Sequence, residues 1–423
     1  MQPDDTIELD VTDVAHGGVF IARHEGRVVF VSDAVPGERV RARITDTGHA
    51  SYWRAETIDV IEASPDRRPH VWPDADLSRP AGNRPGGADF GHIALAAQRS
   101  LKQRVLTDAL SRFGQVRLDV EVEPAGAGET VDGTRWRTRI GLHVAADGSV
   151  GPVAARSHRV IPVASHPLAA APIERAALSL AQEKPGRIDL VLPADGDVRV
   201  VRRPEAPARR SGRRPPRRVE SGASDTITER ALGHDFSVDA GGFWQVHRLA
   251  ADTLGTAVVQ MLREHGFDPV APNLDLYGGV GLFAAAMGVA GGPDTHVTSV
   301  ESAPGATLHA TSNLAGLGSA RAVTGRVDRF LRGAAGADEA GSFSGATVLL
   351  DPPRAGAGRE VVRSIAALAP RIVLYVACDP VALARDVGTF GEAGYRVSAM
   401  RAFDLFPNAH HLEAIAVLEP NGR

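Results

Sequence analysis

The only cysteine among the 423 residues, Cys378, lies where an apolar run of the chain ends. The two residues after it, Asp379 and Pro380, are typical of an N-cap and a first helical residue, so we expect the thiol just before a helix N-terminus. The positive end of a helix dipole favours a thiolate, whereas the charge of Asp379 opposes it. A lone cysteine is more often a small buried residue than a nucleophile, but this place at the end of a strand favours the nucleophile.

Two carboxyl groups have a similar setting. Asp351 ends a buried strand and precedes a rigid Pro-Pro turn, an element that methyltransferases place beside the methyl donor. Arg354 stands where amino-group methyltransferases carry an aromatic residue, which argues against that reaction. Glu413 is a single acid in an otherwise apolar final strand, where an unused charge is costly, and a raised pKa would make it a general base. An ordinary Pro turn and a surface glutamate on an edge strand are the alternatives.

A glycine-rich turn follows a third strand, in the stretch LDLYGGVGLFAA at 274–285. Gly279 and Gly281 allow positive φ and a close approach of a ligand to the main chain after Tyr277. Glu301 ends the next strand, where an acid accepts hydrogen bonds from ribose hydroxyl groups. The pattern predicts a nucleoside site, and at this point NAD(H) remains an alternative to other nucleosides.

Residues 236–423 alternate between helical and strand patterns, and the strands are apolar on both faces. Parallel strands covered by helices have this composition, so we predict a doubly wound, Rossmann-like α/β domain. Ligands of such a domain bind at the carboxyl ends of its strands. Cys378, Asp351, Glu301 and the glycine-rich turn all lie at these ends.

The rest of the chain differs in pattern. Residues 1–62 contain short apolar runs separated by Gly- and Pro-containing turns, which predicts five strands and a small β-barrel. Residues 63–235 combine a Pro-rich linker, a helical pattern at 95–114 and strand-like segments, which predicts a central α+β region. We therefore expect three domains, 1–62, 63–235 and 236–423.

The composition is that of a soluble globular protein, with 43% hydrophobic and 23% charged residues. The single cysteine argues against a secreted protein built on disulfides. The sequence contains no run of 18 apolar residues, so it predicts no membrane span. The acidic N-terminus is not a signal peptide, so we expect a cytoplasmic protein. The net charge is −4, but 202–218 holds eight Arg and one Glu. A solvated loop and a nucleic-acid contact are equally compatible with this insertion.

With these motifs in order, the chain resembles the RNA (uracil-5-)methyltransferases, which make 5-methyluridine in tRNA or rRNA. The stretch 17–44 resembles a TRAM domain, a small OB-like barrel that binds RNA, and 135–168 resembles the central RNA-contacting region of the family. The segment GGFWQVH at 241–247 is similar to the family's Phe-Gln-Val-Asn element. The glycine-rich turn, the Asp-Pro-Pro element, Cys-Asp-Pro and a late His-x-Glu then follow in the family's order.

The resemblance implies S-adenosylmethionine as the methyl donor and a uridine of tRNA or rRNA as the acceptor. Cys378 would attack carbon 6 of the uracil, and Glu413 would remove the proton from carbon 5. The residues implied to bind the donor are Gln245, Tyr277, Gly279, Gly281, Leu282, Glu301 and Asp351. The target base would be unstacked or flipped. We expect no metal site, no membrane partner and a monomeric enzyme.

The chain departs from the family at three places. Some members hold an iron–sulfur cluster through four cysteines, which this chain with one cysteine cannot do, so we expect no cluster. His247 replaces an Asn, and Arg326 stands where an acid or Asn meets the adenine, a role that Asp328 could take. Two other functions therefore stay open: a non-catalytic RNA-binding protein of the same fold and an NAD-dependent oxidoreductase.

Overall fold

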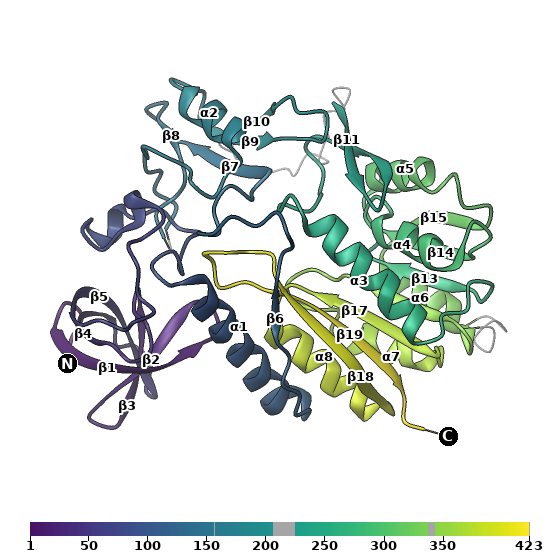
Figure 1. Cartoon of the computed structure of the whole chain (residues 1–423), viewed down its shortest axis with the longest axis horizontal. Helices are drawn as coiled ribbons and strands as arrows, with labels where there is room; N and C mark the ends of the chain where they lie inside the picture. The colour runs from purple at the N-terminus through teal and green to yellow at the C-terminus, as the bar shows by residue number, and fades with distance from the viewer. Residues whose placement is uncertain (156, 206–224, 337–342, 423) are drawn as a thin grey trace, which may run out of the picture.

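The computed structural model describes residues 1–155, 157–205, 225–336 and 343–422. Most of the Arg-rich insertion, residues 206–218, therefore lies outside the described residues. Figure 1 shows a barrel at the N-terminus, a central region above it and a larger α/β region that ends at the C-terminus. Among the helices of the described residues, none is long and apolar enough to cross a membrane.

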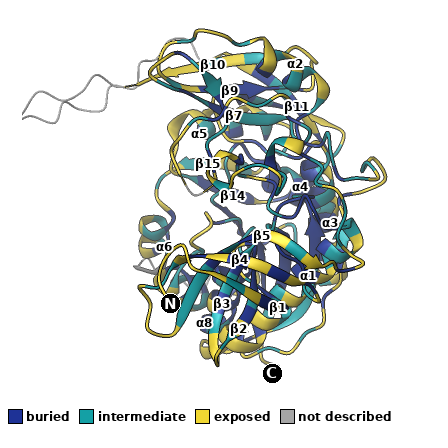
Figure 2. Cartoon of the chain, turned by 90° about the vertical axis from the view of Figure 1, so that its left-hand side faces the viewer, coloured by how far each residue is buried: buried dark blue, intermediate teal, exposed yellow. Residues whose placement is uncertain are grey.

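Five strands close the N-terminal barrel, in the order β1-β2-β3-β5-β4. They are β1 (Thr6–Ala15), β2 (Val19–His24), β3 (Arg27–Ser32), β4 (Arg39–Asp46) and β5 (Tyr52–Glu62). In β4, buried and exposed residues alternate strictly, because neighbouring side chains of a strand point to opposite faces. Figure 2 shows the outward residues as exposed bands along β4 and β5. The predicted five-stranded barrel is thus confirmed.

The segment after the barrel connects it to the rest of the molecule. It contains two short 3₁₀ turns, η1 (Pro73–Ala75) and η2 (Ala81–Asn83), then helix α1 (Leu95–Ala109), which continues as the π-helical turn η3 (Leu110–Gly114), and strand β6 (Val122–Pro124). Leu106 and Leu110 pack into a hydrophobic core of the C-terminal α/β region. Lys102 of the same helix forms a fully buried ion pair with Asp404. This helix therefore packs on the C-terminal core, and its Leu101 also packs into the core of the barrel.

The central region has a four-stranded sheet in the order β10-β9-β7-β8. Its elements are β7 (Arg139–Val144), β8 (Val150–Gly151), α2 (Ala171–Ser179), β9 (Gly186–Val191) and β10 (Arg199–Pro204). The hairpin of β11 (Thr226–Ala231) and β12 (His234–Asp239) follows. Arg202 and Arg203, the first two arginines of the Arg-rich insertion, lie in β10 and pair with Glu183 and Asp189.

An eight-stranded sheet organises the C-terminal region, in the order β15-β14-β13-β16-β17-β19-β18-β6. Its strands are β13 (Asn273–Leu276), β14 (Val297–Glu301), β15 (Ala320–Thr324), β16 (Thr347–Leu350), β17 (Ile372–Ala377), β18 (Tyr395–Asp404) and β19 (Glu413–Pro420), with β6 at the edge. The helices are α3 (Ala250–Glu264), α4 (Leu282–Gly291), α5 (Pro304–Asn313), α6 (Val327–Gly336), α7 (Arg359–Ala367) and α8 (Pro380–Glu392). One apolar cluster includes residues of α3 and α4 and another residues of α7 and α8, so helices cover both faces of the sheet.

Strands β13 to β17 run parallel, as the apolar pattern predicts, whereas β19 runs antiparallel to both β17 and β18. The sequence pattern did not predict β15, which is only partly buried, or α6. The domain boundaries at residues 62 and 235 stay a prediction. Between these boundaries, α1 and β6 pack on the C-terminal sheet.

Candidate active site

Strand β17 places Cys378 at the carboxyl end of the sheet. The last registered pair between β17 and the antiparallel β19 joins Ala377 to Ala414, and Cys378 and Glu413 are the next residues outward. The Glu413 carboxyl group is close enough to the Cys378 thiol to raise its pKa. The thiol and the carboxyl group are therefore neighbours in space, although they are distant in the chain.

The residues after Cys378 begin helix α8. Asp379 is its N-cap, and its Oδ1 accepts hydrogen bonds from the amides of Val381 at 3.0 Å and Ala382 at 2.8 Å. Pro380 is the first helical residue, where a missing N–H costs nothing. The predicted cap is thus confirmed, and it fixes the thiol just outside the positive end of the helix.

Burial and nearby charge keep the thiol protonated. Burial, together with the carboxyl groups of Glu413 and Asp351, raises the pKa of Cys378 to about 12. The guanidinium of Arg354 opposes these effects. A second positive charge near the thiol would therefore be needed to form the thiolate at neutral pH.

Glu413, the first residue of β19, is buried. Its burial raises the pKa of the carboxyl group well above the usual range, Asp351 adds to the rise, and Arg354 opposes it. Within the described residues the side chain has no hydrogen-bond partner. A raised pKa makes the carboxylate of such a buried group a stronger base than that of an exposed one.

Asp351 follows β16 and lies close to a second acid, Asp275 of the adjacent strand β13. Burial raises the pKa of Asp351 to about 7, and the charge of Asp275 contributes. Burial also raises the pKa of Asp275 to about 7, although Ser299 Oγ donates a hydrogen bond to it at 3.0 Å. The other oxygen, Oδ1, is buried and has no hydrogen-bond partner in the described part of the chain.

Asp275 was not among the functional residues predicted from the sequence. Its signal was nonetheless present, because Asp275 is a single acid in a fully buried strand, the same pattern that singled out Glu413. Asp275 also limits the turn that follows it. A Cβ atom at Gly278 would lie 2.6 Å from Asp275 Oδ2 and 2.0 Å from Ser299 Oγ, so only glycine fits there.

The glycine-rich turn has the conformation that its residues predict. Tyr277, Gly279 and Gly281 have φ angles of 63°, 55° and 94°. Gly281 is the N-cap of α4, and Leu282 is its buried first residue. The backbone of the turn therefore lies open to a ligand at the carboxyl end of β13.

Glu301 lies beside this turn at the end of β14. Its carboxylate accepts hydrogen bonds from the amide of Gly279 at 3.3 Å and from the amide of Ala303 at 2.7 Å. The side chain is partly exposed, so its oxygens can accept further hydrogen bonds from hydroxyl groups. The structure thus brings Glu301 and the glycine-rich turn together.

A pocket of about 240 Å³ lies next to Tyr277. Its lining includes Ser302, which follows Glu301, and the pair Arg326 and Asp328. The Arg326 Nε donates a hydrogen bond to Asp328 Oδ1 at 2.9 Å. Both residues that the sequence analysis considered for the adenine contact therefore line the same pocket.

Gln245 lies in the loop between β12 and α3, and it is half-buried. Its neighbour Trp244 is buried against Phe236, with ring centroids 5.3 Å apart. His247 is buried and stacks on Trp136 at 5.4 Å, and burial lowers its pKa to about 4. His247 is therefore a neutral packing residue, while the contact between Gln245 and the donor stays a prediction.

Two neighbouring arginines, Arg354 and Arg137, lack an acidic partner within the described residues. Arg354 is exposed and lies close enough to Cys378 and Glu413 to lower the pKa of both. Arg137 stacks over Trp136 at 5.3 Å, its Nε is buried without a hydrogen-bond partner, and Arg354 together with burial lowers its pKa. The guanidinium of Arg354 therefore lies beside the candidate nucleophile, with that of Arg137 close to it.

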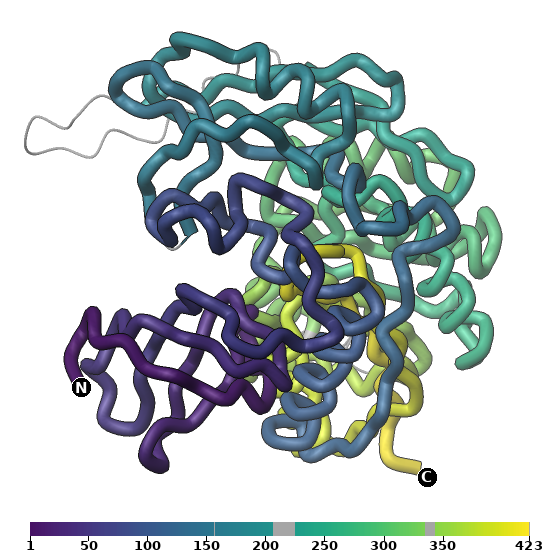
Figure 3. The backbone as a smooth tube through the Cα atoms, turned by 60° about the vertical axis from the view of Figure 1, so that its left-hand side comes forward, coloured from purple at the N-terminus to yellow at the C-terminus, as the bar shows by residue number. Residues whose placement is uncertain are grey.

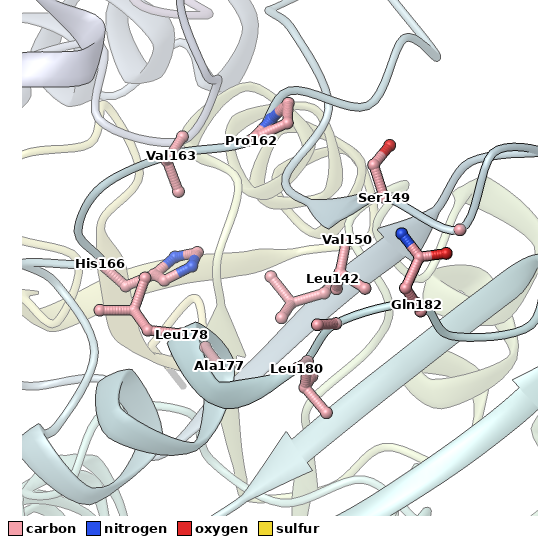
Figure 4. Close-up of a pocket in the computed structure, with 12 residues that line it drawn as sticks. Leu142, Ser149, Val150, Pro162, Val163, His166, Ala177, Leu178, Leu180 and Gln182 are labelled. Carbon is pink, nitrogen blue, oxygen red and sulfur yellow. The ribbon is translucent and has the colours of Figure 1, made fainter.

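Another pocket, of about 280 Å³, lies in the central region and contains neither acid nor thiol (Figure 4). Its lining is largely apolar, with His166 and Gln182 as its larger polar side chains. None of the residues discussed above lines it. The chemistry of the chain is therefore centred on the carboxyl ends of the C-terminal strands.

Comparisons with protein families agree with the motifs. Residues 322–421 match the family described as tRNA (uracil-5-)-methyltransferase, and residues 3–56 match the TRAM domain. The first match contains the Asp-Pro-Pro element, Cys378 and Glu413. The second covers most of the N-terminal barrel.

Individual proteins are similar to the chain over nearly its whole length. An RNA methyltransferase of Streptomyces avermitilis is 38% identical, and the alignment covers 98% of each chain. A 23S rRNA (uracil(1939)-C(5))-methyltransferase of Shewanella piezotolerans is 27% identical over 98% of this chain and 95% of its own. The structure of the Pyrococcus abyssi tRNA (uracil-54, C5)-methyltransferase has a TM-score of 0.67 at 19% identity, covering 97% of this chain and all of its own. That structure shares the fold of this chain.

Proposed function

The chain belongs to the RNA (uracil-5-)methyltransferase family, and we propose that it methylates carbon 5 of a uridine in tRNA or rRNA with S-adenosylmethionine as the methyl donor. The observation that carries the mechanism is the juxtaposition of Cys378 and Glu413 across β17 and β19. A nucleophile and a buried base close to it are the two groups that this reaction needs.

The residues around the glycine-rich turn fit the donor. Glu301 can accept hydrogen bonds from the ribose hydroxyl groups, and the pocket beside Tyr277 is lined by the pair Arg326 and Asp328. The buried, unpartnered Oδ1 of Asp275 is an acceptor for an ammonium group. We assign Gln245, Asp351, Gly279, Gly281 and Leu282 to the same site. When bound, S-adenosylmethionine supplies an electrophilic methyl group on a positively charged sulfur.

Cys378 and Glu413 then have separate roles. Carbon 5 of uracil is a poor nucleophile, and attack of the Cys378 thiolate on carbon 6 forms an Sγ–C6 bond and an enolate whose charge reaches carbon 5. After carbon 5 has gained the methyl group, it still holds its original proton. Glu413 accepts that proton, the ring double bond re-forms and the Sγ–C6 bond breaks, which returns the thiolate.

The charges around the site support a polyanionic substrate. Arg137 and Arg354 have no acidic partner in the described residues, Arg354 lies beside the thiol, and Arg137 is close enough to Arg354 for the two charges to interact. Phosphate groups of RNA bind such guanidinium groups. The half-buried thiol can reach carbon 6 only of an unstacked base, so the target is a single-stranded or flipped uridine.

A methyl-transfer assay tests the proposal. The full-length enzyme is incubated with tritiated S-adenosylmethionine and with unmodified tRNA or 23S rRNA transcripts, and the product nucleoside is identified. We expect tritium in 5-methyluridine from one RNA class. Label in another nucleoside would refute the carbon 5 assignment, and no label with either RNA would favour the non-catalytic RNA-binding alternative.

The oxidoreductase alternative is tested by ligand binding. The glycine-rich turn alone is compatible with NAD, but family membership argues against that function. We expect S-adenosylhomocysteine, and not NAD, to raise the melting temperature of the protein, because only the ligand that binds the folded state stabilises it.

A further inference from the structure

The turn between β1 and β2 of the barrel reaches the loop that carries the candidate nucleophile. His16 Nε2 lies 3.3 Å from Asp379 Oδ2. Asp379 is the residue after Cys378, and its other oxygen caps helix α8. A barrel residue from the start of the chain therefore contacts the N-cap next to the thiol.

The same turn also approaches the loop that carries the candidate base. Gly18 has a φ of 72°, and a Cβ atom there would lie 2.9 Å from His410 Nδ1 and 2.6 Å from Asp89 Oδ2. Asp89 in turn forms an ion pair with His410. In Figures 1 and 3 the yellow loop between β18 and β19 extends from the sheet toward the central and N-terminal parts of the chain. The barrel turn thus lies against both loops that flank the reaction.

The contact between His16 and Asp379 changes the electrostatic environment of the Cys378 thiol. Cys378 faces Glu413 from β19, Asp351 and Arg354 from the loop after β16, and Asp379 from its own loop. Of these groups only Arg354 favours the thiolate. A hydrogen bond or positive charge on Asp379 reduces the field of its carboxylate at the neighbouring sulfur. His16 supplies this contact at Oδ2 of Asp379, since the helix amides bind Oδ1.

We propose that His16 is a positioning residue for the methyl-transfer reaction, that it acts on Cys378 through Asp379, and that the N-terminal barrel is thereby part of the active site. This inference rests on the nucleophilic role proposed for Cys378. It gives the barrel a function that does not depend on bound RNA, because the contact exists in the protein alone.

Thiol labelling measures this effect directly, since Cys378 is the only cysteine. The rate of alkylation by iodoacetamide is followed by intact mass between pH 7 and 10, in the full-length protein without RNA. We expect His16→Ala to slow labelling about two- to tenfold at neutral pH and to move the pH profile upward. His16→Gln keeps an N–H donor without a charge and should restore part of the rate.

Two further variants separate a local effect from general loosening of the barrel. Arg104→Ala removes the ion pair at 2.8 Å between α1 and Asp13 of the barrel, away from Asp379, and should leave the labelling rate unchanged. In an Asp379→Asn background, His16→Ala should have no further effect, because its target charge is gone.

Equal rates and pH profiles for His16→Ala and the unaltered protein would overturn the inference. So would an equal slowing in Arg104→Ala, or an undiminished effect of His16→Ala in the Asp379→Asn background. If His16→Ala does not fold, the same comparisons are made with His16→Gln. Failure of the proposed function can be told apart from failure of this inference. Methyl transfer by a Cys378→Ala variant would refute the nucleophilic role of Cys378, whatever the labelling rates are.

Discussion

Cys378 follows the last residue of β17 and Glu413 begins β19, and a negative charge on Glu413 disfavours the thiolate of Cys378. Burial, together with the carboxylates of Glu413 and Asp351, raises the pKa of the thiol to about 12, and burial also raises the pKa of the Glu413 carboxyl group. The thiol is therefore protonated at neutral pH in the protein alone. A cationic donor beside it would shift both groups toward ionisation, so that the nucleophile forms when the donor is present.

Cys378→Ala should abolish methyl transfer and keep binding of the donor. The substitution removes the only atom that can add to carbon 6, while the glycine-rich turn and Glu301 are on other strands. We expect activity at least about 10³-fold lower, as for loss of a covalent nucleophile. Initial rates with tritiated donor and calorimetry with S-adenosylhomocysteine measure the two properties. Substantial residual transfer would refute the assignment.

Glu413→Gln should trap the reaction after methylation. Without a base the carbon 5 proton stays, so the Sγ–C6 bond cannot break and protein remains linked to RNA. A denaturing gel with labelled RNA should show a slowly migrating band that disappears in the double variant with Cys378→Ala. Normal turnover without this band would assign the base elsewhere, with Asp351 as the nearest other carboxyl group.

The sequence predicted much of this site because its signals are local. An acid or a thiol at the end of an apolar run is placed at the carboxyl end of a strand, and Asp379-Pro380 specifies a helix start. The five-stranded barrel and the parallel strands also follow from local patterns of apolar residues and turns. These features depend on neighbours in the chain.

Other features depend on contacts between distant residues. The ion pair of Lys102 with Asp404, which places α1 in the C-terminal core, joins residues about 300 positions apart. The contact of His16 with Asp379 and the approach of Asp275 to Asp351 are likewise tertiary. Strand β15 was missed because its residues are only partly buried, so the apolar pattern is weak.

Glu301→Gln should weaken donor binding about 10- to 100-fold, since two hydrogen bonds to a charged acceptor become bonds to a neutral one. Gly279 donates to Oε2 and Ala303 to Oε1, so the single amide oxygen of the variant can keep the shorter bond, to Ala303, and loses the longer one. Calorimetry with S-adenosylhomocysteine measures the change. Glu264→Gln, an exposed residue of α3, is the matched control. Equal affinities of the two variants would argue that Glu301 serves only the turn.

Arg354→Ala should reduce RNA affinity and make it less dependent on salt. If the guanidinium binds one phosphate, the slope of log K against log salt should decrease by about one. Fluorescence anisotropy at several salt concentrations measures the slope independently of activity. Arg112→Ala, an exposed residue paired with Asp108 on the far end of α1, should behave as the unaltered protein. An unchanged slope for Arg354→Ala would remove it from the RNA contact.

Asp275→Asn should stabilise the protein above pH 7 and change little near pH 4. The pKa of Asp275 is raised to about 7 in the folded protein from about 3.8. Folding therefore favours the protonated carboxyl group of Asp275. The contribution of this group to the free energy of unfolding is complete below about pH 4 and is lost as the pH rises through 7. An amide cannot lose this proton, so the variant should avoid a loss on the order of 1–4 kcal/mol. Urea unfolding at pH 4.5 and 8 measures the difference. Because Asp275 is also assigned to the donor site, the same variant should bind S-adenosylhomocysteine more weakly. A gain in stability without a loss of affinity for S-adenosylhomocysteine would make the role of Asp275 structural.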